Sequence, residues 1–132
     1  MKLSRKSEYA LLALIDLAKN YPDLVKGSQI SKRNNIPKKF LEQIFLNLKG
    51  AGYVISKRGY NGGYKLLKQP KDITMAEIVR LFDGAIAPVG SVSEHFYEET
   101  PIEEHNGLVK VLRKIRNYTS DILEETTLKD LM

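Results

Sequence analysis

The sequence predicts a mainly α-helical fold with one small β-hairpin, and three patterns lead to that prediction. Five segments carry helix signals, either apolar residues at helical spacing or residues that cap a helix. Two β-prone runs, residues 53–58 and 64–67, flank a glycine-rich turn with an Asn-Gly step, which favours a hairpin. The last helical segment is long and carries an apolar seam of the kind that pairs with another helix. At 132 residues, the chain has the length of one domain with a small extension.

Three helices are expected within the first fifty residues. The first runs from Arg5 to Asn20 with Ser4 as its N-cap, and the second is short, about residues 29–33, with Ser28 as its N-cap. Pro37 suits the first turn of the third helix, where its missing N–H costs nothing. A helix, a short turn and then a helix with a polar outer face form a helix-turn-helix arrangement. The apolar face of the third helix consists of Phe40, Leu41, Ile44, Phe45 and Leu48.

The predicted hairpin follows the third helix directly, and a hairpin in that position is a wing. After it, Thr74-Met75-Ala76-Glu77 is a capping box that opens a fourth helix, which ends at Asp83-Gly84. The next stretch contains five glutamates, no Lys or Arg, and several Pro and Gly residues, so it is expected to be a loop. We therefore expect a winged helix-turn-helix DNA-binding domain at residues 1–84, an acidic loop at 85–106 and, at 107–132, a dimerisation helix with a C-terminal tail.

The last helix is expected from about Gly107 to Glu125. Its seam positions are separated alternately by four and three residues, which is typical of a helix that pairs with another helix. About two and a half heptads are marginal for one helix alone, so one interpretation is a homodimer contact. The other interpretation is a helix folded back onto its own domain. The seam consists of Leu108, Leu112, Ile115, Thr119 and Ile122.

Charge is divided unevenly along the chain. Residues 1–72 hold 15 Lys or Arg against 5 Asp or Glu, whereas residues 73–132 hold 6 against 11, within a net charge of +5. A basic half joined to an acidic half is expected when one end meets phosphate and the other meets protein or water. The alternative is that the lysines only keep the surface soluble.

Candidate contacts with double-stranded DNA lie before the first helix, on the second and third helices and on the wing. Lysines near the start of the third helix can reach phosphates or guanine edges, Glu42 can accept from cytosine N4, and Gln43 can bond to adenine in the major groove. Basic and polar residues of the wing suit phosphate or the minor groove. The alternatives are a solvated helix face and a frayed, charged N-terminus. The candidates are Lys2, Ser4, Arg5, Lys6, Ser28, Lys38, Lys39, Glu42, Gln43, Asn47, Lys57, Arg58, Tyr60 and Asn61.

The sequence predicts neither an enzyme nor a bound cofactor. It has no cysteine, which excludes disulfides and thiolate-ligated metal or cluster sites. The two histidines have no Ser or Asp at the spacing of a catalytic triad, and there is no phosphate-binding loop. His95 and His105, together with Glu99 and Glu103, could bind zinc or iron, although a solvated acidic loop is the commoner reason for such residues.

The sequence also lacks signals for a membrane or for export. No apolar run approaches the ~20 residues of a membrane-spanning helix. The apolar stretch at residues 9–18 is broken by Asp16 and has no small-residue cleavage site, so it does not match a signal peptide. We therefore expect a cytoplasmic protein.

Several short motifs occur together in this chain. The most specific are Phe40-Leu-Glu-Gln43 and the wing motif Arg58-Gly-x-x-Gly-Gly-Tyr-x-Leu66. The others are Met1-Lys-Leu-Ser4, Tyr9-Ala10, Ile73-Thr74, Ile78-Val79, Ala87-Pro88-Val89 and Thr127-Leu-x-x-Leu131. With these motifs, the chain resembles the Rrf2 family of bacterial transcription regulators over nearly its whole length. The resemblance implies a homodimer of winged helix-turn-helix domains with crossing C-terminal helices, bound to a palindromic operator that the third helix reads.

Many members of that family hold an iron–sulfur cluster on three cysteines in the loop before the dimer helix. By spacing, those positions fall here on Ser91, Tyr97 and Glu103, and none of them is a thiolate. Asn106 falls where some members have a fourth, non-cysteine ligand, and Pro37 departs from the Ser that often starts the reading helix. The resemblance therefore implies a sensor other than a cysteine-ligated cluster. The acidic loop is a candidate site for an effector protein or a small molecule.

Three hypotheses for function remain open from the sequence. The first is a sequence-specific DNA-binding regulator that acts as a repressor. The second is a signalling or scaffold protein that acts through protein–protein contacts. The third is a metal- or redox-dependent regulator that uses His95 and His105. Salt-sensitive, sequence-preferring binding to DNA separates the first from the second, and a metal assay tests the third.

Overall fold

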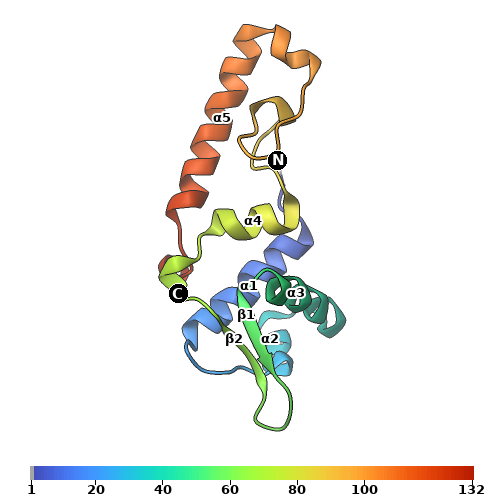
Figure 1. Ribbon diagram of the computed structural model, residues 1–132, viewed down its shortest axis with the longest axis vertical. Helices are drawn as coiled ribbons and strands as arrows, with labels where there is room; N and C mark the ends of the chain where they lie inside the picture. Colours follow the sequence, from blue (N-terminus) through green and yellow to red (C-terminus); the bar gives the residue numbers. More distant parts are fainter. Residues whose placement is uncertain (1) are drawn as a thin grey trace.

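The computed structural model describes residues 2–132, and its elements form two parts stacked along the long axis of the molecule (Figure 1). The helices are α1 (Arg5–Lys19), α2 (Gly27–Asn34), α3 (Lys38–Gly50), α4 (Met75–Asp83) and α5 (Asn106–Glu125), and the strands are β1 (Val54–Lys57) and β2 (Gly63–Leu66). One part contains α1, α2, α3 and the hairpin; the other contains α5 and the loop before it, and α4 lies between them. The mainly helical fold with one hairpin that the sequence predicts is confirmed.

A short third segment extends the hairpin. Strands β1 and β2 pair antiparallel, with Val54 opposite Leu66 and Lys57 opposite Gly63. Val25, in the connection between α1 and α2, forms an antiparallel bridge with Tyr64 of β2. The backbone N–H of each of these two residues donates to the carbonyl oxygen of the other at 2.8 Å. Strand β2 is therefore hydrogen-bonded on both of its edges at Tyr64.

One apolar core holds the helix-turn-helix and the hairpin together, and the C-terminal tail completes it. Leu128, which follows α5, is fully buried there, and its N–H donates to the carbonyl of Ile73 at 3.0 Å. Burial of a leucine side chain contributes roughly 1.5–3 kcal/mol, so the tail is a structural part of the N-terminal domain. Other fully buried members of this core include Leu14, Leu17, Ile30, Ile36, Ile44, Phe45, Leu48, Val54 and Ile78.

The start of α2 differs from the sequence-based prediction. Ser28 is not the N-cap; the helix begins at Gly27, and its N-cap residue, Lys26, makes no side-chain capping bond. The bridge at Val25 fixes the backbone up to that point, so the helix starts as soon as the chain leaves the bridge. Similarly, Pro37 is the N-cap of α3 rather than a residue of its first turn. The expected left-handed turn after α2 is present, at Asn35 with a φ of 56°.

A carboxylate on α1 holds the end of α2. Asp16 is 8% exposed and accepts hydrogen bonds from Arg33 Nη2 at 2.7 Å, Arg33 Nε at 3.1 Å and Asn34 Nδ2 at 2.9 Å. Burial raises the pKa of Asp16, but the hydrogen bonds from Arg33 and Asn34 outweigh that effect and leave the pKa below its ordinary value. This pair of charged hydrogen bonds orients α2 before the chain turns into α3.

The fourth helix connects the two parts of the molecule. Its N-terminus has the predicted capping box, in which the Thr74 hydroxyl accepts from Glu77 N–H at 3.2 Å and the Glu77 carboxylate accepts from Thr74 N–H at 2.8 Å. Near its C-terminus, Arg80 forms an ion pair with Glu124 of α5 at 2.5 Å. The loop at 85–106 is irregular apart from two short 3-10 turns, Gly90–Val92 and Pro101–Glu104.

We expect Asp16→Ala to lower the free energy of unfolding by roughly 1–3 kcal/mol, because charged donors on Arg33 and Asn34 lose their acceptor. Urea unfolding at pH 7 measures this, with Asp23→Ala, an exposed Asp in the turn after α1, as the control. Because the pKa of Asp16 is lowered in the folded state, its contribution is complete above the unfolded value of about 3.9 and is lost as pH falls through the folded pKa. The stability difference between Asp16→Ala and wild type should therefore shrink below about pH 4; a constant difference would contradict this account.

Candidate nucleic-acid interface

The outer face of α3 is polar and exposed. Lys38, Lys39, Glu42, Gln43 and Asn47 are all exposed, as the sequence predicts, while Leu41, Ile44, Phe45 and Leu48 are buried on the opposite side. Nothing in the chain covers the outer face within residues 2–132. Leu46, which sequence reasoning did not single out, lies on the same outer face and is 71% exposed. The helix therefore presents charge, amide groups and one apolar side chain together.

An aromatic stack couples this helix to the wing. The rings of Phe45 on α3 and Tyr64 on β2 lie 3.9 Å apart, centroid to centroid, with an interplanar angle of 9°. Gly27 lies against the same tyrosine ring, and a Cβ there would be 3.2 Å from Tyr64 Cε2. Since Tyr64 is also hydrogen-bonded to Val25, α3, the wing and the start of α2 form one unit. In Figure 1 the hairpin projects past the helices at one end of the molecule.

Two glycines of the wing are required by the close approach of the backbone. A Cβ on Gly62 would lie 2.1 Å from the carbonyl oxygen of Lys57, and one on Gly63 would lie 2.5 Å from that of Val25. Gly63 also has a φ of +148°, which side-chain-bearing residues rarely adopt. These glycines shape the hairpin, and any contact with DNA comes from the side chains around them.

The tip of the wing carries exposed basic and polar groups. Lys57, Arg58 and Asn61 are exposed, and Tyr60 is 88% exposed. The ammonium of Lys26, at the start of α2, lies 4.9 Å from the centre of the Tyr60 ring. This cation–π contact places a further positive charge at the tip. Sequence reasoning missed Lys26 because 34 positions separate it from Tyr60; only its basic character was visible.

The N-terminal candidates separate into two groups. Arg5 lies 5.8 Å from the centre of the Tyr9 ring, and Tyr9 packs edge-on against Phe40 at the start of α3 with ring centroids 5.2 Å apart. Arg5 is therefore near the beginning of α3. Ser4, in contrast, caps α1, and both its N–H and its hydroxyl donate to the Asp83 carboxylate at the end of α4.

The carboxyl of Asp83 has a shifted pKa because of this contact. Burial raises the pKa, and the hydrogen bonds from Ser4 outweigh it, so the pKa lies below its ordinary value. Ser4 thus has a structural role that the sequence did not reveal beyond its capping position. Lys6 and Ser28, the remaining candidates here, are exposed, and Lys2 lies beside Asp83 in a recess with α4.

The predicted apolar seam of α5 is exposed at three of its five positions. Leu112 and Thr119 are half-buried against the chain itself, whereas Leu108, Ile115 and Ile122 are exposed. One face of α5 packs onto α4 and the loop, and Leu112 and Thr119 lie toward that face. The dimer contact through the predicted seam stays a prediction. The stripe that stays exposed, here called the α5 stripe, consists of Leu108, Val111, Ile115, Tyr118 and Ile122.

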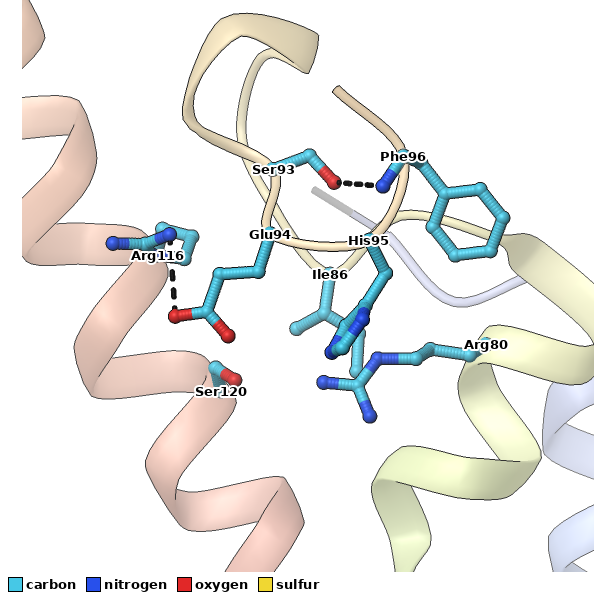
Figure 2. A pocket seen from close by; sticks show the side chains of 8 residues that line it. All are labelled: Arg80, Ile86, Ser93, Glu94, His95, Phe96, Arg116 and Ser120. Atoms are coloured by element: carbon cyan, nitrogen blue, oxygen red, sulfur yellow. Dashed lines mark hydrogen bonds and ion pairs between the residues drawn. The ribbon is translucent and has the colours of Figure 1, made fainter.

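The loop side chains do not form the metal site that the sequence left open. His105 caps α5: its Nδ1 accepts from Leu108 N–H at 3.0 Å. Among residues 2–132, no three His, Asp or Glu side chains come together in a way that could hold a metal ion. Because His95 points to a different place, near Arg80, the two histidines do not share a site (Figure 2).

The positions that correspond to the cluster cysteines, Ser91, Tyr97 and Glu103, carry oxygen groups that take part in hydrogen bonds within the loop. The Tyr97 hydroxyl donates to the Glu103 carboxylate, which raises the pKa of Tyr97, and the Thr100 hydroxyl donates to Ser91 Oγ at 3.1 Å. An iron–sulfur cluster is held by thiolates, with imidazole in some cases, and this donor set has neither at those positions. The residues therefore do not fit the cluster.

The chain was compared with known proteins. The family model Rrf2, described as an iron-dependent transcriptional regulator, matches residues 3–132. The chain belongs to the Rrf2 family. The HTH-type transcriptional regulator CymR of Bacillus subtilis is 37% identical over 134 residues, covering 99% of this chain and 89% of CymR. IscR of Cereibacter sphaeroides is 42% identical over 89 residues, covering 65% of this chain and 57% of IscR.

Solved structures of two Rrf2 regulators have the same fold. The structure of B. subtilis CymR, called there the global cysteine regulator, has a TM-score of 0.80 at 35% identity and covers 99% of this chain and 95% of its own. T. potens IscR has a TM-score of 0.75 at 29% identity, with coverage of 99% and 85%. This Rrf2 protein is thus a DNA-binding transcription regulator of the winged helix-turn-helix type and not an enzyme. Between residues 2 and 132, no helix is both long and apolar enough to cross a bilayer.

We expect Gly63→Ala to distort the wing, because the new methyl group would meet the Val25 carbonyl and the φ would be strained. The expected loss in the free energy of unfolding is roughly 1–3 kcal/mol. Gly50→Ala is the matched control, since a Cβ there meets nothing within 4 Å, and it should be neutral or slightly stabilising. Chemical denaturation of both variants measures the effect, and equal stabilities would contradict the assigned role of Gly63.

Proposed function

We propose that this Rrf2 regulator is a repressor that binds a palindromic operator as a homodimer, with α3 in the major groove and the hairpin as its wing. The observation that supports this most is the stack of Phe45 on Tyr64, which gives the exposed face of α3 and the basic wing one fixed relative position. A DNA-binding domain whose recognition helix and wing are fixed relative to each other can contact base edges and the DNA backbone in a single register.

The outer face of α3 has the chemistry of base recognition. Glu42 can accept from cytosine N4, Gln43 can bond to adenine, and Leu46 can contact a thymine methyl group. Lys38 and Lys39 stand at the start of the helix, where they can reach phosphates or guanine. Further phosphate or minor-groove contacts come from Arg5, Lys26, Lys57, Arg58, Tyr60 and Asn61.

The α5 stripe is the proposed dimer surface. Its members follow one another at spacings of three and four residues, so they form one continuous apolar line along the helix. Tyr118, at its middle, is 73% exposed in the single chain. A second copy of α5 crossing it would cover this line from both sides in a two-fold contact. Two reading helices related by that two-fold axis match a palindromic operator.

The sensor of this regulator is proposed to lie in the loop at 85–106 and not to be a cluster. The whole sequence has no cysteine, and the corresponding positions carry a hydroxyl, a phenol and a carboxylate. Repression would then be relieved or strengthened by an effector that this loop recognises. Binding sites selected from a random DNA pool test the function: a palindromic sequence should emerge, and a pool without any preference would refute sequence-specific binding.

Arg58→Ala should weaken operator binding measured by gel shift across a salt series. Removing one phosphate or groove contact should also reduce the slope of log affinity against log salt by about one. Lys71→Ala, which removes an equal charge from the exposed 3-10 turn before α4, is the control and should bind as the wild type does. If Arg58→Ala binds with unchanged affinity and slope, the assigned wing contact is wrong.

Ile115→Arg should convert the dimer to a monomer, because it places a charge in the middle of the α5 stripe. Sedimentation velocity measures the oligomeric state, and circular dichroism shows whether the fold persists. Asn117→Arg is the control: it is exposed, and two residues along the helix place it about 200° away from Ile115. A dimer that survives Ile115→Arg, or that is lost equally in both variants, would rule out this surface.

A further inference from the structure

We propose that a pocket between the loop, α4 and α5 binds a small anion, either an inorganic oxyanion or a small carboxylate, as an effector of this regulator. With the Glu94 side chain in place the pocket has a volume of only about 10 Å³, so an anion enters by displacing that side chain. The pocket is lined by Arg80, Ile86, Ser93, Glu94, His95, Phe96, Arg116 and Ser120 (Figure 2). Its role as an effector site rests on the proposed function, whereas binding itself does not.

The first argument is an unpaired buried donor. Arg116 projects from α5 and is only 13% exposed. Its Nη1 donates to the carbonyl of Val92 at 2.9 Å, but its Nε has no partner. Within residues 2–132, the only other buried polar side-chain atom without a hydrogen-bond partner is the hydroxyl oxygen of Ser7. Buried donors in folded proteins almost always have an acceptor, so this N–H indicates a place for one.

The second argument is the convergence of donors on the same space. Arg80 comes from α4, is 20% exposed and shares its guanidinium with Glu124, to which its Nη1 is ion-paired at 2.5 Å, while Ser93 and Ser120 are buried in the pocket wall. Figure 2 shows His95 extending from the loop toward Arg80. Two guanidinium groups with hydroxyl and imidazole donors match the needs of a carboxylate or an oxyanion, because guanidinium binds both with paired N–H groups.

The third argument is that Glu94 already imitates such a ligand. Its carboxylate is an internal anion 3.3 Å from Arg116 Nη1, which is longer than the usual 2.7–2.9 Å of a charge-assisted hydrogen bond. The Glu94 side chain is 53% exposed, so about half of it is already in solvent and it can swing away from Arg116. An incoming anion could replace it at Arg116 and also reach the unpaired Nε. Glu94 would then act as a weak internal competitor.

An anion held here would connect the loop to the DNA-binding part. Arg80 belongs to α4, and Glu77, in the first turn of the same helix, accepts a hydrogen bond from the Tyr53 hydroxyl at 3.1 Å. Tyr53 directly precedes β1 of the wing. Ligand binding that draws Arg80 and Arg116 together would therefore shift α4 and α5 relative to each other, and with them the hairpin or the dimer surface.

Binding is tested by NMR on the full-length protein with ¹⁵N-labelled arginine. Sodium sulfate and sodium phosphate form the inorganic arm, and sodium acetate and sodium malonate form the carboxylate arm, all at constant ionic strength. The Nε–H signal of Arg116 should shift in a saturable way with at least one arm, while that of Arg113, exposed on the same helix, stays constant. No shift at Arg116 with any of the four salts, or a parallel shift at Arg113, would overturn the proposal.

Variants give a second readout by thermal unfolding with the same salts. Arg116→Met should abolish the salt-specific rise in Tm that the wild type shows, and Arg113→Met should keep it. Glu94→Gln removes the internal competitor and should tighten binding by about two- to five-fold, the range of an exposed ion pair. Weaker binding by Glu94→Gln would contradict the proposed competition even if Arg116→Met fails to fold.

The effector role is tested separately by gel shift on the selected operator. A saturating concentration of the anion identified by NMR should change operator affinity in the wild type and not in Arg116→Met. Unchanged affinity in the wild type would overturn the effector role. If the protein binds the anion but no DNA, the proposed function fails while the anion site stands; if it binds DNA but no anion, the reverse holds.

Discussion

The stack of Tyr64 on Phe45 is the contact on which the DNA-binding end of this molecule depends. A wing is a two-stranded hairpin, and such a hairpin is at most marginally stable by itself. Here β2 is held on one side by the backbone bonds to Val25 and on its face by an aromatic ring of the reading helix. The position of the wing therefore follows from the position of α3, and α3 is set in turn by α2 and Asp16.

The short C-terminal tail fixes the end of α5 to the N-terminal domain. After α5, the chain returns to pair Thr127 with Thr74 and to bury Leu128 beside Ile73. The contact lies at the entrance to α4, immediately before its capping box. Both ends of α5 are thus tied to the N-terminal domain: one by the tail, the other through the loop and α4. A helix tied in this way cannot rotate without moving α4.

Local signals in the sequence predicted most of the fold. The Ser4 cap, the Thr74–Glu77 capping box, the hairpin and the helix-turn-helix each depend on residues within a few positions of one another. The sequence failed where a distant contact decides the outcome. The bridge from Val25 to Tyr64 moved the start of α2 away from Ser28, and no local pattern encodes that pairing. The pocket at Arg116 was equally invisible, because its donors come from three separate segments.

The seam of α5 shows what helical periodicity alone leaves undecided. Apolar residues spaced three and four apart can form either of two neighbouring lines along one helix. The spacing alone does not show which line packs against the rest of the same chain and which stays exposed. Leu112 and Thr119 are half-buried against the rest of the chain, whereas Val111 and Tyr118, the residues just before them, are exposed. The two faces of α5 are therefore adjacent: Arg116 lies on the inner face, directly beside Ile115 on the outer one. If the proposed anion binds at Arg116 and the stripe forms the proposed two-fold contact, a small rotation of α5 would change the separation of the two copies of α3.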